Sequence, residues 1–387
     1  MSLSARQILD HLVSYPTVSR DTNLPLIDWT EGYLADLGIM AHRMPKRGDP
    51  SKEAIFCSVG PHVPGGVVLS GHTDVVPVEG QDWSSDPWAV SERDGRLYGR
   101  GTCDMKGFDA LALHALQQAL ECDLKRPIQV ALSFDEEIGC AGAPPLIEAM
   151  AESGLPKAAI AIIGEPSMMQ CVTGQKGSAG FDVHVKGFEV HSSMMDKGVN
   201  AVMAASRLIH WANGKNEELR ACVPSTVAAN FDPPFTTLHV GMIKGGTAQN
   251  ITAGDCRFGI DWRLVPDEDA DRLDGEFRAV VAEVDAAAKA IAPSAGVRLR
   301  PFHDVPALVP EENGAAEALV RGITGDNGIH VVSYGTEAGH FQDAGCSAVI
   351  CGPGDIAQAH QADEFIAVEQ FEAGGAFLAR VVESLTT

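Results

Sequence analysis

The distribution of apolar residues predicts two kinds of folding unit in this chain. In the first part, continuous apolar runs such as "GGVVLSG" (65–71) and "AAIAIIGE" (158–165) alternate with helical patterns such as "GFDALALHALQQALEC" (107–122). Apolar runs without alternation are typical of strands that helices cover on both faces. The pattern therefore predicts an α/β domain with a mostly parallel sheet between helices, in which the loops after the strands form the favoured ligand site.

Further elements of the same style belong to this domain. The apolar runs predict strands at 53–59, 127–135 and 347–354 and helices at 143–153, 312–323 and 367–385. The N-terminal residues have the amphipathic spacing of a helix.

The pattern changes after Gly174. The segments "SAGFDVHVKG", "TTLHVGMIKGG" and "GDCRFGIDWRL" alternate apolar and polar residues, as half-exposed antiparallel strands do. Two helical patterns, at 200–214 and 269–292, and a last strand, "GVRLRPF", complete the order of a split βαβ sandwich. We expect residues 177–292 to form this inserted α+β domain, and residues 1–176 and 293–387 to form the α/β domain.

Charge and composition narrow the class of protein. The 387 residues carry a formal net charge of -23, which argues against nucleic acid or an anionic membrane as partner because phosphates would be repelled. No apolar run reaches eighteen residues, and the first residues lack the apolar core of an export signal. None of the nine cysteines lies in a C-x-x-C pair. We expect a cytoplasmic protein with reduced thiols rather than a zinc–sulfur site.

Acidic and histidine side chains follow the apolar runs at five places: His72 and Asp74, Asp104, Asp135 to Glu137, Glu165, and His360. Each alone has an ordinary explanation, such as a solvated loop histidine, a helix cap at Asp104 or a solvated turn at Glu136 and Glu137. At the strand ends of one sheet, however, they would converge. Two histidines and three carboxylates suit two zinc-like ions that share a carboxylate. One of the adjacent Glu136 and Glu137 could then bind metal while the other accepts a proton.

The segments "SGHTDVVP", "GRGTCDMKG", "DEEIG", "GEPS" and "AHQADEF" resemble, in order and spacing, the dinuclear zinc amidohydrolases, and among them the acetylornithine deacetylases. The resemblance implies two ligand sets: His72, Asp104 and Glu165 for one ion, and Asp104, Glu137 and His360 for the other. It also implies Glu136 as general base and acid, and a cis peptide bond after Asp104. The carboxylate of Asp74 would accept a hydrogen bond from the far ring nitrogen of His72.

In the inserted domain, the resemblance implies a lid that also forms a homodimer. His191, contributed by the dimer mate, would donate to the oxyanion, and Asn250 and Arg263 would bind the substrate carboxylate. Lys176 would be a further basic contact, or else a solvated hinge residue. Glu337 would meet a cationic amine, or else have a structural role in its loop.

The resemblance implies hydrolysis of an N-acyl amino acid, with N-acetyl-L-ornithine as the favoured substrate in arginine biosynthesis. Two divalent ions, Zn²⁺ first and Co²⁺ or Mn²⁺ as alternatives, would activate the attacking water. Succinyl-diaminopimelate, another N-acyl amino acid and a dipeptide remain alternative substrates, and a metal-free binding protein is the non-enzymatic alternative. Cys103, beside the shared ligand, and His340, in "EAGHF", depart from the deacetylase pattern. Cys103 is expected to take no part in the chemistry, and His340 leaves open which amine the enzyme recognises.

Overall fold

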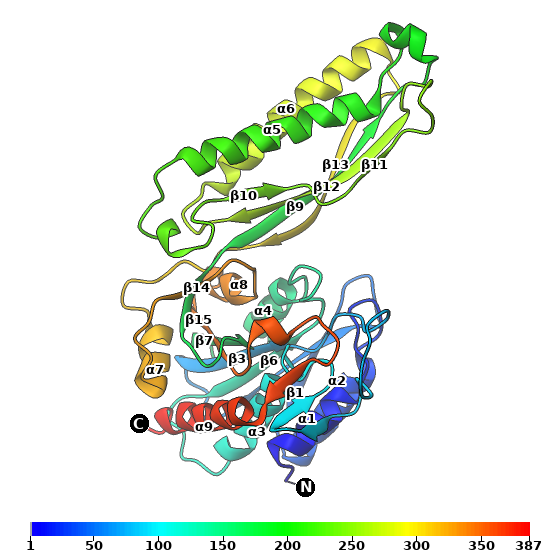
Figure 1. Ribbon diagram of the computed structural model, residues 1–387. Coiled ribbons are helices and arrows are strands. Elements are labelled where there is room, and N and C mark those ends of the chain that lie inside the picture. The colour runs from blue at the N-terminus through cyan, green and yellow to red at the C-terminus, as the bar shows by residue number, and fades with distance from the viewer. Residues whose placement is uncertain (1) are drawn as a thin grey trace. The chain divides into compact units, whose positions relative to one another are not determined.

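The computed structural model describes residues 2–387, which fold into two compact units (Figure 1). Unit 1 comprises the described residues up to Gln175, Leu308–Val331 and Thr336–Thr387, and unit 2 comprises Lys176–Ala307 and Val332–Gly335. Unit 2 begins at Lys176, one residue before the expected start at 177. Its end lies beyond 292, because the last strand of unit 2, β13 (Gly296–Val305), pairs with β9 (Gly177–Lys186).

An eight-stranded mixed sheet forms the centre of unit 1, in the order β1-β2-β6-β3-β7-β15-β8-β14. Its strands are β1 (Ala41–Pro45), β2 (Glu53–Val59), β3 (Gly66–His72), β6 (Ile128–Ser133), β7 (Ala158–Pro166), β8 (Val172–Gln175), β14 (His330–Val332) and β15 (Ser347–Gly352). The central strands β6, β3, β7 and β15 are parallel, which confirms the predicted α/β class. The sequence missed β1, β8 and β14, which are short strands toward the two edges of the sheet.

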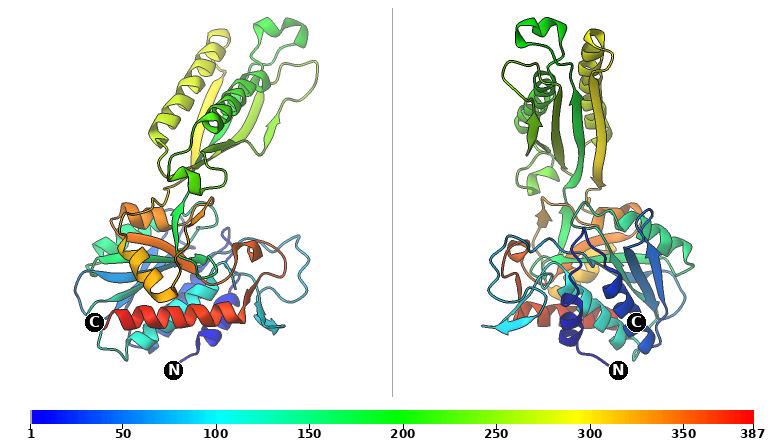
Figure 2. Two further views of the ribbon diagram at one scale, coloured as in Figure 1. Left: turned by 60° about the vertical axis from the view of Figure 1, so that its left-hand side comes forward. Right: turned by 90° about the vertical axis from the view of Figure 1, so that its right-hand side faces the viewer.

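Helices cover both faces of this sheet (Figure 2). They are α1 (Ala5–Val13), α2 (Leu24–Asp36), α3 (Lys106–Ala119), α4 (Ala143–Glu152), α7 (Ala315–Thr324), α8 (Ala338–Asp343) and α9 (Val368–Ser384). Successive side chains of β3 pack into the two helical layers in turn. Val67 and Leu69 pack in the main core with α1, α2, α3, α7 and α9, whereas Val68 lies with side chains of α4 and α8. The side chain of every second residue points to the opposite face.

Parallel strands bring the chemistry-bearing segments to one edge of the sheet. His72 is the last residue of β3 and pairs with Ser133 at the end of β6, and β7 runs beside β3 to carry Glu165. A small sheet of β4 (Ser91–Arg93), β5 (Arg96–Tyr98) and β16 (Phe365–Ala367) adds the segments that lead to Asp104 and follow His360.

Unit 2 is a split βαβ sandwich, as the sequence predicted. Its sheet has the order β10-β12-β9-β13, with α5 (Ala201–Ala221) and α6 (Ala270–Ile291) packed on one face. The strand expected at 236–246 is two short strands, β10 (Thr237–His239) and β11 (Ile243–Gly245), both paired with β12 (Asp255–Leu264). The partners of His239 and Ile243 are Asp261 and Phe258, so the edge strand has one extra residue here. This bulge interrupts the expected strand.

Short 3₁₀ turns complete the described elements: η1 (Ser192–Lys197), η2 (Ala228–Asn230) and η3 (Ile356–Gln358). Among the described residues no helix combines the length and the apolar character needed to cross a bilayer. All nine cysteines are free thiols.

Candidate metal centre

The carboxylate of Asp104 lies between two imidazoles. Its Oδ1 is 3.1 Å from Nε2 of His72, at the end of β3, and its Oδ2 is 3.0 Å from Nε2 of His360, in the loop before β16. Asp104 itself ends the turn that leads into α3, and the peptide bond to Met105 is cis, as the family resemblance implied. One carboxylate that faces two imidazoles in this way is arranged as a bridging ligand.

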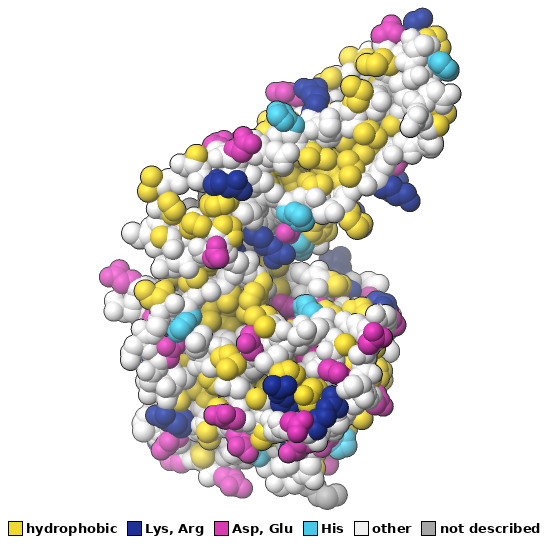
Figure 3. Space-filling view, in the orientation of Figure 1, with side chains coloured by type: hydrophobic (Ala, Val, Ile, Leu, Met, Phe, Trp, Pro, Cys, Tyr) yellow, Lys and Arg dark blue, Asp and Glu magenta, His cyan; other side chains and the backbone are white. Residues whose placement is uncertain are grey.

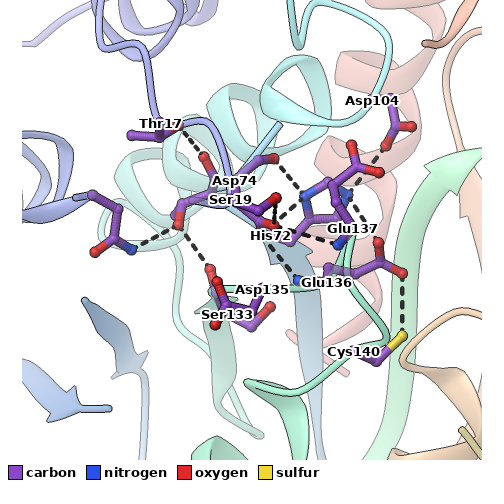
Figure 4. Close-up of polar contacts among 12 residues, drawn as sticks. Thr17, Ser19, His72, Asp74, Asp104, Ser133, Asp135, Glu136, Glu137 and Cys140 are labelled. Atoms are coloured by element: carbon purple, nitrogen blue, oxygen red, sulfur yellow. Dashed lines mark hydrogen bonds and ion pairs between the residues drawn. The ribbon is translucent and has the colours of Figure 1, made fainter. Parts of the chain in front are cut away.

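Further carboxylates lie close to these imidazoles, and Figure 4 shows Glu136 and Glu137 beside His72. Oε2 of Glu137 is 3.0 Å from Nε2 of His360, and Oε1 of Glu165 is 3.6 Å from Nε2 of His72. Glu136 lies next to Glu137 but 3.9 Å from His72, and its Oε1 is in contact with the thiol of Cys140. The structure thus brings together the five ligand candidates and the candidate base from five separate segments of unit 1.

This donor set fits divalent cations. Atoms of His72, Asp104 and Glu137 lie within 4.8 Å of one another, and so do atoms of His72, Glu136 and Glu165. Oε1 of Glu137 is buried and has no hydrogen-bond partner among the described residues. A buried carboxylate oxygen is costly without a partner, and a cation beside His360 would supply one. Imidazole and carboxylate are ligands that zinc and neighbouring metals share.

The pKa values of the clustered side chains also favour bound cations. Burial, with repulsion from the neighbouring carboxylates, raises the pKa of Glu136 to about 8 and that of Glu137 to about 7. Burial would also raise the pKa of Asp104, but hydrogen bonds from His360 and His72 hold it well below its usual range. The hydrogen bonds to Asp104 and Glu137 raise the pKa of His360 to about 10. Without cations the site therefore retains protons, and bound cations would remove the repulsion that keeps them there.

Comparison with known proteins shows the family of this chain. A model of the peptidase family M20/M25/M40 matches residues 68–384. The chain belongs to this family. An acetylornithine deacetylase from Myxococcus xanthus is 36% identical over 392 residues, which cover 97% of this chain and 96% of the relative. Family membership and the candidate ligand cluster identify the chain as an enzyme, a metal-dependent amidohydrolase.

Solved M20 structures share the fold. An M20 metallo-carboxypeptidase from Sulfolobus solfataricus superposes with a TM-score of 0.77 at 17% identity, with 99% of each chain covered. A dinuclear metal-binding M20 peptidase from Bacillus subtilis gives a TM-score of 0.64 at 15% identity, over 99% of this chain and 98% of the other.

Asp74 differs from its expected role in this M20 site. Nδ1 of His72 faces the main-chain carbonyl of Asp74 at 2.9 Å, whereas the Asp74 carboxylate is 3.8 Å away. That carboxylate instead accepts hydrogen bonds from the Ser19 hydroxyl and from the main-chain amides of Glu136 and Glu137. Asp74 therefore holds the loop that carries the candidate base, and a main-chain group orients the imidazole.

Glu337 is not placed as a substrate contact. It is 1% exposed, and its two oxygens accept hydrogen bonds from the hydroxyls of Ser70 and Ser133. These serines lie on β3 and β6, just before the ligand loops, so Glu337 joins the two strands. Asp135 is likewise structural, because its carboxylate is paired with the ammonium groups of Lys46 and Lys52.

Cys103 and His340 are the two departures from the expected pattern. The Cys103 thiol is buried 3.4 Å from the main-chain oxygen of Asp355. Burial and the nearby carboxylates of Glu364 and Asp104 raise its pKa well above the usual range, which keeps it protonated and a poor ligand. His340 lies on α8, three residues after Glu337.

The remaining candidates lie in unit 2. The side chain of His191 caps η1, where its Nδ1 accepts from the Ser193 amide, and the main chain of Asn250 pairs with Ser192 beside it. Arg263 lies on β12, with its Nε 3.0 Å from Asp261. Lys176 is buried and donates to the carbonyls of Pro233 and Phe235, and burial lowers its pKa to about 8. These bonds make Lys176, which lies between β8 and β9, a buried structural residue rather than an exposed basic contact.

Sequence reasoning missed the residues that support the ligands. Glu364 receives four hydrogen bonds from the turn that carries Asp104, and Arg100 joins Glu364 to Gln81. The only signals in the sequence were an acid four residues after His360 and an arginine between two glycines. Neither pattern indicates a supporting role until the fold brings the loop of Arg100 next to the loop of Glu364.

Proposed function

We propose that this enzyme hydrolyses the amide bond of an N-acyl amino acid, with N-acetyl-L-ornithine as its substrate and ornithine and acetate as products. The observation that carries the reaction type is the Asp104 carboxylate between His72 and His360, with an additional acid, Glu136, left over for proton transfer. The substrate rests on the similarity to an acetylornithine deacetylase over nearly the whole chain. Such an enzyme would act in arginine biosynthesis in the cytoplasm.

We assign His72, Asp104 and Glu165 to one divalent ion and Asp104, Glu137 and His360 to the other, with Zn²⁺ the first choice and Co²⁺ or Mn²⁺ as alternatives. When bound, the ions would polarise the acyl carbonyl and lower the pKa of the attacking water. Each histidine offers its Nε2 to the centre, and the main-chain oxygen of Asp74 fixes the ring of His72.

Glu136 would act as general base and then as general acid. It accepts a proton from the attacking water and returns it to the amine nitrogen as the amide bond breaks. Its position next to Glu137 is held by the two amide hydrogen bonds to Asp74. Burial raises the pKa of Glu136 to about 8 when no ion is bound, and a bound cation nearby would lower it and favour the ionised base.

In unit 2 we assign His191 to the oxyanion, and Asn250 and Arg263 to the substrate carboxylate. Because Nδ1 of His191 accepts a hydrogen bond from Ser193, the ring proton is left on Nε2 for donation. Among the described side chains, Asp261 alone pairs with Arg263, and it does so through Nε. The two terminal nitrogens of the guanidinium could then bind a carboxylate.

We further propose that the enzyme is a homodimer through unit 2. Exposed apolar side chains gather around η1 and the start of α5: Phe188, Met194, Met195, Met203 and Ile251. In Figure 3 hydrophobic side chains are also grouped over the visible face of this unit. Such patches mark association surfaces. Light scattering should give a dimer for the native chain and a monomer for Met195→Glu combined with Met203→Glu.

The deciding experiment compares hydrolysis of N-acetyl-L-ornithine, succinyl-diaminopimelate, N-acetyl-methionine and a dipeptide, with Zn²⁺ or Co²⁺ and with chelator. Metal-dependent turnover concentrated on N-acetyl-L-ornithine is expected. Turnover of another member of this panel would replace the substrate and keep the chemistry. Undiminished turnover after complete removal of metal would overturn the chemistry itself.

A further inference from the structure

Glu364 is a buried carboxylate that receives four hydrogen bonds, and its oxygens contact the ligand candidates only at the main-chain amide of Asp104. Its Oε1 accepts from the main-chain amides of Cys103 at 2.9 Å and Asp104 at 3.1 Å. Its Oε2 accepts from Nη1 of Arg100 at 2.6 Å and from the amide of Gly101 at 3.1 Å. The side chain is 1% exposed. Every donor comes from one turn, 100–104, and that turn ends in Asp104.

The same residue is tied to His360 by the chain and by a second route. Glu364 follows His360 by four positions, and its main-chain oxygen accepts from the amide of Gly99. The guanidinium of Arg100 also donates to Oε1 of Gln81 at 2.6 Å, and Nε2 of Gln81 donates to the main-chain oxygen of His360 at 2.9 Å. A closed ring of contacts therefore runs from His360 through Gln81, Arg100 and Glu364 back along the chain to His360.

We propose that Glu364 is a positioning residue that sets the distance between Asp104 and His360 and thereby the affinity for the ion held by Asp104, Glu137 and His360. This inference rests on the proposed function. Glu364 acts only through main-chain groups and through Arg100, and it lies outside the residues that could hold an ion.

The physical reason is that three amide donors of one turn, those of Gly101, Cys103 and Asp104, converge on one anion. This fixes the conformation of the turn more tightly than separate water contacts would. The buried charge is compensated by Arg100, whose side chain is also 1% exposed. A loss of the charge, or of one acceptor oxygen, frees the turn and leaves buried donors unpaired. The carboxylate of Asp104 would then no longer be held 3.0 Å from His360.

The test is the Glu364→Gln variant, which keeps the shape of the side chain but replaces one acceptor by an amide donor. Zn²⁺ is titrated into chelator-stripped protein against a chromophoric chelator that resolves two affinities, and the Co²⁺ absorption spectrum reports the ligand geometry. We expect one affinity to fall about ten- to a hundredfold, as for other residues that support ligands, with a changed Co²⁺ spectrum. The matched control is Glu317→Gln, which removes the carboxylate partner of Arg321 on α7 and should leave both affinities unchanged.

A lower melting temperature of the metal-free variant with both Zn²⁺ affinities unchanged would show a structural role only and overturn the inference. If Glu364→Gln does not fold, Gln81→Leu breaks the ring on the His360 side and keeps Glu364. We expect this variant to weaken the same affinity severalfold, and unchanged affinities would again contradict the inference. Failure of the native chain to bind any ion would instead refute the proposed metal centre, so the two failures are distinguishable.

Discussion

The carboxylate of Asp74 accepts hydrogen bonds from the main-chain amides of both Glu136 and Glu137, while its own carbonyl holds His72. A single residue, two positions after the end of β3, thus positions a ligand candidate, His72, and the loop after β6 that carries the candidate base. The two adjacent acids differ in position, because this loop directs Glu137 to His360 and leaves Glu136 3.9 Å from Nε2 of His72.

Replacement of Asp74 by Asn tests this arrangement. The amide side chain keeps the size of the carboxylate but turns an NH₂ group toward at least one of the donors it must satisfy. We expect kcat to fall about ten- to a hundredfold with a smaller change in KM, because Glu136 is displaced from the reacting water. Ser19→Ala removes only one hydroxyl donor to Asp74 and should have a smaller effect. An unchanged kcat for Asp74→Asn would show that the loop does not depend on it.

Replacement of Glu136 by Gln separates proton transfer from metal binding. We expect kcat to fall by about 10² to 10⁴, the usual contribution of a general base, while the metal content measured by mass spectrometry stays that of the native chain. The control is Glu148→Gln, which removes an exposed carboxylate on α4. Loss of metal from Glu136→Gln would instead make this residue a ligand.

Removal of metal should lower both activity and stability. The carboxylates of the centre are buried close together, and bound cations relieve their repulsion. At a free Zn²⁺ concentration of 1,000 times the dissociation constant, binding to the folded state alone would add about 4 kcal/mol to the free energy of unfolding. Calorimetry of stripped and reconstituted protein measures the difference. For His360→Ala the added Zn²⁺ should raise the melting temperature less than for the native chain.

The pH dependence of stability can be tested at Asp326, which is not one of the candidate site residues. Its carboxylate accepts from the amides of Cys171 and Gly328 and contacts His330. Burial opposes the charge, but the main-chain hydrogen bonds of Gly328 and Cys171 and the contact with His330 lower its pKa below the ordinary 3.8. The folded state therefore binds this proton less readily than the unfolded state, and the stability it contributes is complete above pH 3.8 and lost as pH falls below it.

Asp326→Asn removes this titration. We expect the variant to be less stable than the native chain at pH 7 by about 1 kcal/mol, the scale of a lost hydrogen bond, and the difference to shrink as pH falls below 4. Urea unfolding from pH 7 to pH 3 measures it. A difference that stays constant with pH would mean that the charge of Asp326 contributes nothing.

The turn that connects β7 to β8 predicts a stabilising substitution. Met168 and Met169 both have positive φ, 56° and 60°, and the amide of Gln170 bonds to the carbonyl of Ser167. Turns with two such residues favour Asn or Gly over side chains such as Met. Since Met168 is 45% exposed, Met168→Asn should raise the free energy of unfolding by about 0.5 kcal/mol, measured by urea titration. Met168→Leu, which keeps an apolar side chain, should not.

By itself the sequence determined the class of the fold and the segments that form the centre. Continuous apolar runs mark buried parallel strands, and the ends of such strands meet at one edge, so His72, Asp104, Glu136, Glu137, Glu165 and His360 could be named as one group from periodicity and motif. These signals are local, because alternation and turns depend on neighbours in the chain. For the same reason the short edge strands, with little apolar content, escaped prediction.

Only the tertiary structure decided what the supporting side chains do. Asp104 and Glu364 are 260 positions apart, and Ser70 and Glu337 are 267 apart. A carboxylate beside a predicted pocket looks the same in sequence whether it faces a substrate or, like Glu337, two buried hydroxyls. The choice is made by which donors the fold places within hydrogen-bond distance, since a buried charge must find partners wherever the packed chain supplies them.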